Sequence, residues 1–140
     1  MAIVIVHLKR SAFVLSESQV FDLSRSSKYY KLLGNDYTHL PLNKTKAKHQ
    51  VNTVEEAVQC YKENLYSVVI QERLLNNKPY TDLLFNLYDN FKKLNSEDKD
   101  MYLGCWCKDE LIPKHYDHSC HCDVIKNILI KKWNKENGSN

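Results

Sequence analysis

The sequence has little glycine and little proline. With 3 residues of each among 140, it fits neither the collagen-like class nor the disordered classes rich in these residues. It also lacks an apolar run of the roughly 20 residues that a membrane-spanning helix needs. No Gly-x-Gly-x-x-Gly and no P-loop pattern occurs, which argues against Rossmann-type dinucleotide binding and P-loop hydrolysis. What remains is one domain's length of ordinary composition, 43% hydrophobic and 26% charged.

The N-terminal residues lack the features of a signal peptide. Their apolar run is short, and it begins at Ala2 without a preceding basic segment. We therefore expect a cytoplasmic protein with no membrane partner. In that compartment the 5 cysteines are thiols, metal ligands or catalytic groups rather than disulfides. The net charge of +3 allows a nucleic-acid partner without requiring one.

The hydrophobic pattern predicts an α/β fold. The β-branched run over 3–8 is typical of a strand covered on both faces, and MYLGCWC over 101–107 predicts another strand. Shorter extended pieces are expected at 13–15 or 20–23. From Arg25 to Gln50 the sequence is polar and basic, which predicts a long loop with one short helix.

Three helices are expected. A capping box of Thr53 and Glu56 starts the first, which continues to about residue 75. The second covers 81–94, and the third begins near Cys120. We expect a small single α/β domain over residues 1–135, with a short, mostly parallel sheet flanked by helices, and a frayed tail over 136–140.

Cysteine and histidine gather between Cys105 and Cys122, which hold four of the 5 Cys and three of the 6 His. Zinc prefers four thiolate or imidazole ligands, so Cys105, Cys107, Cys120 and His121 are candidate ligands for zinc or another divalent metal, although one residue between paired cysteines is less than usual. One alternative is a set of buried thiols that behave as small hydrophobes. Another is an anion site at the helix start, where the pKa of a thiol is lowered. No cofactor is required with certainty.

The segment after Arg25 interleaves lysines with tyrosines. Such a pattern suits phosphate contact combined with base stacking. The candidate nucleic-acid-binding residues are Lys28, Tyr29, Lys31, Lys44 and Lys46, and Lys48 and Tyr37 belong to the same segment. The alternative is a solvated loop whose tyrosines pack in the core.

The crevice between the end of the 101–107 strand and the helix that begins at Cys120 is the candidate site. Ligands of open α/β sheets bind beyond the carboxyl ends of the strands. There His121 is a possible acid or base, and Asp123 is a possible orienting carboxylate or metal ligand. In the alternative interpretation Asp123 only caps the helix, and His121 caps it or ligates zinc.

These motifs resemble an uncharacterised family of small bacterial and phage proteins, the domain of unknown function 4326. The specific pieces are Leu-Gly-Cys-Trp-Cys before the loop and Cys-His-x-Asp-Val-Ile at the start of the last helix. Asp22-Leu23-Ser24-Arg25 and Leu33-Gly34-Asn35-Asp36-Tyr37 are similar to two upstream motifs in degenerate form. The resemblance covers residues 20–133.

The resemblance implies a small α/β domain whose shared polar residues converge on one pocket. Carried over, these are Arg25, Asn35, Cys105, Cys107, Cys120, His121 and Asp123. The chain departs from the family at Cys122, where the family has glycine, and at Asp36 and Tyr37, where it has proline and phenylalanine. These departures suggest a diverged, phage-type member. No reaction is implied, because the family's activity is not established.

We predict a nucleic-acid-directed enzyme, a small nuclease or nicking activity of phage type. Uracil-derived abasic DNA would be the easier substrate, and the enzyme would be a hydrolase or lyase. Arg25 would hold the phosphate, Asn35 would orient the ligand, His121 would move the proton, and Asp123 would fix its ring or hold a metal. Two alternatives stay open: a nucleotide-binding or nucleotide-modifying domain, and a non-enzymatic inhibitor or adaptor that binds a host protein of DNA metabolism.

Overall fold

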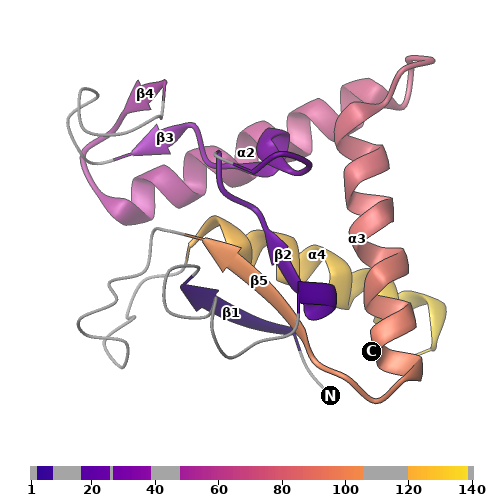
Figure 1. Cartoon of the computed structure of the whole chain (residues 1–140). Helices are drawn as coiled ribbons and strands as arrows, with labels where there is room; N and C mark the ends of the chain where they lie inside the picture. Colours follow the sequence, from indigo (N-terminus) through magenta and orange to yellow (C-terminus); the bar gives the residue numbers. More distant parts are fainter. Residues whose placement is uncertain (1–2, 8–16, 26, 39–47, 106–119, 139–140) are drawn as a thin grey trace.

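The protein is a small α/β structure, as the sequence predicts. A computed structural model describes residues 3–7, 17–25, 27–38, 48–105 and 120–138. Within them, a three-stranded sheet lies beside three long helices, and two very short strands form a separate pair (Figure 1). In the described residues, no helix is long and apolar enough to cross a membrane.

The three-stranded sheet is entirely parallel, with the strand order β1-β5-β2. Its strands are β1 (Ile3–His7), β2 (Val20–Asp22) and β5 (Met101–Cys105). The register places Ile5 and Phe21 on either side of Leu103. Because residues in register share a face, these three apolar side chains form one row toward the core. The last of the described strands is therefore the central strand of the sheet.

One face of the sheet is packed more completely than the other. Ile3, Met101 and Leu103 are buried in the core and α4 contacts both β1 and β5. Val4 points to the opposite face, where its side chain is 37% exposed. The expectation that the β1 run is covered on both faces is thus wrong for Val4, since an apolar run does not distinguish one packed face from two.

The helices are α2 (Val54–Glu72), α3 (Pro79–Ser96) and α4 (His121–Glu136). The Thr53 hydroxyl accepts the backbone N–H of Glu56 and caps α2, as predicted, while the Glu56 carboxylate accepts from the N–H of Asn52. Pro79 occupies the first turn of α3, where its missing N–H costs nothing. The helix α3 is two residues longer at each end than predicted, and α4 ends where the frayed tail was expected.

A buried carboxylate joins the end of α2 to the start of α3. Glu72 is 3% exposed, and its oxygens accept from the backbone N–H groups of Tyr80 and Thr81 and from the Thr81 hydroxyl, at 2.8–3.0 Å. The Glu72 carboxylate satisfies the first N–H donors of α3. The helix α2 ends at Glu72, short of the predicted residue 75.

The segment from Arg25 to Gln50 contains more structure than predicted. It holds the expected short helix, η2 (Lys31–Leu33), and also two short parallel strands, β3 (Tyr37–Thr38) and β4 (His49–Gln50). Backbone N–H groups of Lys48 and His49 donate to the Asp36 carbonyl, which joins the end of this segment to its middle. In Figure 1 the β3–β4 pair lies beside the first half of α2. Another short helix, η1 (Glu17–Gln19), precedes β2.

Of the two short extended pieces expected from sequence, only one falls within the described residues. The one at 20–23 corresponds to β2. The one at 13–15 lies outside the described residues, as do Trp106 and Cys107 of the predicted 101–107 strand.

Candidate functional site

The start of α4 meets the carboxyl ends of the parallel strands. The His121 side chain contacts the carbonyl of Leu23, the residue after β2. The Cys122 side chain contacts the carbonyl of Gly104, the penultimate residue of β5. This is the edge of an open α/β sheet at which ligands bind. The predicted meeting of the strand ends with the start of α4 is therefore present in the described residues, and its use as a ligand site stays a prediction.

Asp123 caps α4. Its carboxylate accepts the backbone N–H of Cys120 at 2.7 Å, which is one half of a capping box. A negative side chain in the first turn also stabilises the helix through its dipole. The structure thus gives Asp123 the position that the capping interpretation predicts, and its role toward a ligand stays a prediction.

His121 is buried. Its side chain is 4% exposed, and Nε2 lies 2.8 Å from the Leu23 carbonyl oxygen. Because a carbonyl only accepts, Nε2 carries the hydrogen and donates it. Burial lowers the pKa of His121, and the Arg25 charge lowers it further against the opposing effects of Cys120, the Leu23 carbonyl and Asp123. The helix start is therefore buried at His121, and the imidazole is neutral near pH 7.

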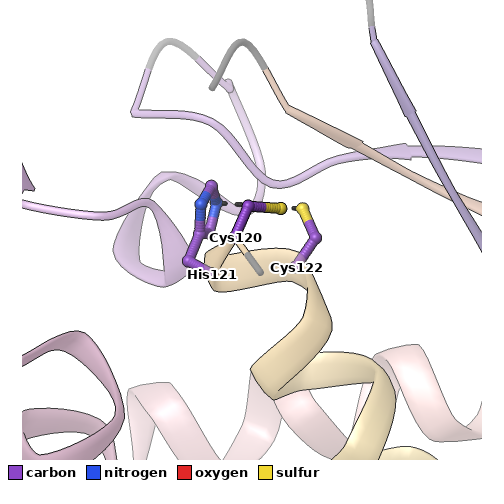
Figure 2. A group of neighbouring side chains, drawn as sticks. All are labelled: Cys120, His121 and Cys122. Carbon is purple, nitrogen blue, oxygen red and sulfur yellow. Dashed lines mark hydrogen bonds between the residues drawn. The ribbon is translucent and has the colours of Figure 1, made fainter. Parts of the chain in front are cut away.

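Cys120, His121 and Cys122 bring their side chains together (Figure 2). One ligand atom from each lies within 4.8 Å of the other two, all three residues are buried, and the Cys122 sulfur is 3.9 Å from His121 Nε2. Two thiols and an imidazole are donors suited to zinc, so this group could bind a metal. The set predicted from sequence shares Cys120 and His121 with this group. Cys107 and the side chain of Cys105 lie outside the described structure, so that four-ligand set stays a prediction.

Tyr61 connects this group to the η2 turn. Its ring packs edge-on against the His121 imidazole with 5.3 Å between centroids, and its hydroxyl donates to the Leu33 carbonyl at 2.7 Å. Burial raises the pKa of Tyr61 well above its usual value, and the neighbouring thiols of Cys122 and Cys120 raise it further. The phenol therefore remains protonated and acts as a fixed donor.

Gly34 and Arg25 touch closely. A Cβ at Gly34 would lie 2.7 Å from the Arg25 backbone nitrogen and 2.9 Å from its Cα. The next residue, Asn35, is buried, accepts the N–H of Tyr37 at 2.8 Å, and donates to the Ala57 carbonyl of α2. The turn therefore contacts Arg25 through Gly34 and α2 through Asn35, and the Asn35 side chain acts on backbone groups in the described structure.

A basic pocket opens beside this turn. It has a volume of about 320 Å³ and is lined by Arg25, Lys31, Leu32, Asp36, Lys48 and Tyr80. Three of these side chains are cationic and one is a carboxylate. Among the described residues, Lys31, Lys48 and Asp36 form no ion pair, although they line the same space. A concave site with an excess of positive charge attracts an anion.

Family comparison agrees with the motifs. A family model described as a domain of unknown function, DUF4326, matches residues 6–131. This chain belongs to the DUF4326 family. The matched range includes the pocket, the Gly34 turn and the start of α4, and it begins before the resemblance inferred from sequence. No curated protein and no solved structure matches the chain.

In this DUF4326 member, Arg25 and the predicted nucleic-acid-binding residues fall into three groups. Arg25 and Lys31 line the pocket, and the Arg25 charge acts on His121, so the pocket and the α4 start lie within electrostatic reach. Lys28 and Tyr29 are exposed outside the pocket lining, with Tyr29 packed edge-on against Tyr30. Lys44 and Lys46 lie outside the described residues. Their roles in binding stay predictions.

Sequence reasoning missed two polar pocket residues of this DUF4326 member. Asp36 drew attention only as a departure from the family, and Tyr80 lies in the first turn of α3, far along the chain from the basic segment. An acidic residue within a basic stretch was the available signal for Asp36. No local pattern marks Tyr80, because folding alone brings it to the pocket.

Proposed function

We propose that this protein recognises the phosphate of a nucleotide, either free or within a nucleic acid, in the pocket lined by Arg25, Lys31 and Lys48. The observation that carries the proposal is a pocket of about 320 Å³ with three cationic side chains from separate parts of one folded segment. The planar guanidinium of Arg25 suits two phosphate oxygens, and the lysines supply point charges. The lining residue Arg25 follows the carboxyl end of β2 by three residues, and α/β proteins bind ligands beyond the carboxyl ends of their strands.

Strand cleavage is the second step of the proposal. A small nuclease or nicking activity on DNA needs a proton-moving group or a metal near the phosphate. His121 is within the electrostatic reach of Arg25, but its Nε2 is occupied by the Leu23 carbonyl. The geometry therefore supports phosphate binding more directly than hydrolase or lyase chemistry. We include in this proposal that the protein is of phage type and is located in the cytoplasm.

Binding should be measured with fluorescently labelled single-stranded DNA and with adenosine monophosphate at several salt concentrations. We expect both affinities to fall in the double variant Lys31→Ala/Lys48→Ala. The salt dependence of DNA binding should become shallower, because fewer phosphate contacts release fewer counterions on binding. The matched control is Lys93→Ala/Lys131→Ala, which removes two exposed lysines that neither line the pocket nor belong to the basic segment. Equal losses in control and pocket variants would contradict the proposal.

Assays on the same purified protein distinguish the alternative functions. Binding of the nucleotide without DNA affinity would favour a nucleotide-binding or nucleotide-modifying domain. Nicking of abasic or uracil-containing supercoiled DNA, tested with and without divalent metal, would establish the enzyme. A host-protein adaptor would bind neither ligand in a salt-dependent way.

A metal centre is a second candidate property, favoured by the three donors that meet at the start of α4. Cys120, His121 and Cys122 would hold zinc or another divalent metal, which would stabilise the fold because metal-binding energy adds to folding energy. Ligation through Nε2 of His121 would require that atom to give up its hydrogen bond to the Leu23 carbonyl. Metal analysis of purified protein, followed by Co²⁺ addition, tests this: thiolate ligands give an intense near-ultraviolet charge-transfer band. Absence of bound metal together with absence of that band would leave these residues as buried thiols.

A further inference from the structure

Asp36 lines a basic pocket without neutralising it. Its carboxylate forms no hydrogen bond or ion pair within the described part of the chain, although Arg25, Lys31 and Lys48 line the same space. A pocket built only to hold phosphate gains nothing from a carboxylate, because like charges repel. The presence of this side chain needs another explanation.

The backbone holds Asp36 from both sides. The Asn35 side chain accepts the N–H of Tyr37 at 2.8 Å, and the Asp36 carbonyl accepts the N–H groups of Lys48 and His49 at 3.0 and 2.9 Å. The carboxylate therefore projects from a backbone that is fixed by the β3–β4 pair. A side chain on such a support is suited to a defined contact with a ligand.

Tyr80 completes the polar lining. Burial raises the pKa of its phenol, and the charges of Asp36 and Glu72 raise it further, so the hydroxyl stays protonated. Its backbone N–H is held by Glu72, which fixes the start of α3 beside the pocket. The pocket thus combines cations, a neutral phenol and an acceptor-only carboxylate.

We propose that Asp36 accepts a hydrogen bond from a sugar hydroxyl of the ligand while Arg25, Lys31 and Lys48 hold its phosphate. The ligand class is a phosphorylated sugar with a free hydroxyl, as in a free nucleotide or at the end of a nucleic-acid strand. Nucleotides in the interior of a DNA strand have no free sugar hydroxyl and are poorer ligands for this pocket. This inference rests on the proposed function and refines it.

The test compares inorganic phosphate, ribose 5-phosphate and 2-deoxyribose 5-phosphate by calorimetry at constant ionic strength. With wild-type protein we expect both sugar phosphates to bind about tenfold more tightly than inorganic phosphate, as a charged hydrogen bond allows. In Asp36→Asn this preference should fall to about twofold or less, while inorganic phosphate binds more tightly because repulsion is removed. Asp36→Ser provides a second variant that removes the charge.

The control is Glu63→Gln, which removes one exposed negative charge in the middle of α2 without touching the pocket. It should bind all three compounds as wild-type protein does. Equal wild-type affinity for phosphate and both sugar phosphates overturns this inference and leaves the proposed phosphate site standing. Failure of all three compounds to bind overturns the proposed function and this inference together.

Discussion

At the scale of single residues, Gly34 is required for space rather than for backbone freedom. Its φ of −70° and ψ of 155° are open to any residue, but a Cβ would press on the Arg25 backbone. We expect Gly34→Ala to lower the free energy of unfolding by about 1–3 kcal/mol, as overpacking does. Urea denaturation measures this.

The same substitution should also weaken ligand binding, because Arg25 must shift away from the new methyl group. Gly138 is the comparison position: a Cβ there meets nothing within 4 Å, but its φ of +71° makes any loss one of backbone strain. Unchanged stability in Gly34→Ala would show that the turn and Arg25 separate easily, and the account of this contact would be wrong.

His121 should make the folded state sensitive to mild acid. Its folded pKa lies below the ordinary value of 6.5, so the unfolded chain binds a proton first as pH falls. As far as His121 determines it, the free energy of unfolding is therefore highest above about pH 6.5 and decreases below that pH. The melting temperature should fall between about pH 7 and pH 5.

The control variant is His121→Gln, whose amide can still donate to the Leu23 carbonyl but does not titrate. It should lose less stability over that pH range than wild-type protein. Parallel pH profiles for both proteins would place the acid sensitivity in other groups.

At the scale of elements, the cap of α2 is a local feature with a local effect. The Thr53 hydroxyl accepts the Glu56 N–H at 3.0 Å. We expect Thr53→Ala to cost about 1 kcal/mol of stability, while Thr53→Ser, which keeps the hydroxyl, remains close to wild type. Thermal unfolding of the two variants in parallel distinguishes the lost hydrogen bond from the lost methyl group.

The junction of α2 and α3 depends on Glu72. Removing its carboxylate leaves the Tyr80 and Thr81 N–H groups without their acceptor, so Glu72→Ala should cost about 2 kcal/mol. Burial alone raises the pKa of Glu72, but these donors and Lys78 outweigh it, and the pKa lies below 4.5. The contribution is therefore present above about pH 4.5 and is lost as pH falls through the lower, folded value.

Urea titrations of wild type and Glu72→Ala at neutral and acidic pH check both parts of this prediction. The difference between the two proteins should shrink in acid. A constant difference across pH would mean that the side chain acts through packing and not through its charge.

Elements with local signals were predictable from sequence. The Thr53 cap, the apolar stripe of α3 with Leu87 and Phe91, and the β-branched run of β1 each determine their own structure. The β3–β4 pair carries no such signal, because two residues per strand show no periodicity. It forms where the Asp36 carbonyl meets the backbone of Lys48, and that meeting depends on the surrounding fold.

At the scale of the whole molecule, the sequence led to the edge of the sheet but not to the composition of the site. Two Cys-containing motifs predicted that the strand end and the start of α4 meet, and they do. The burial of His121 and the position of Tyr80 in the pocket lining were not predictable from sequence. Both depend on how α2 and α3 pack over the turn around Gly34. A charge pattern in the sequence indicates candidate binding residues. Long-range packing determines which of these residues line the same pocket.

The central position of β5 sets the order in which the nascent chain can fold. The helices α2 and α3 follow one another and contact each other, so they can pair soon after synthesis. The strands β1 and β2 must instead wait for Met101–Cys105 before either gains a neighbour. Until then the Ile-Val-Ile-Val run of β1 is an unpaired apolar edge, the kind of segment that chaperones bind and that aggregates. Pulsed hydrogen exchange should therefore show α2 and α3 protected before β1, and a chain truncated ahead of Met101 should keep helical signal yet precipitate.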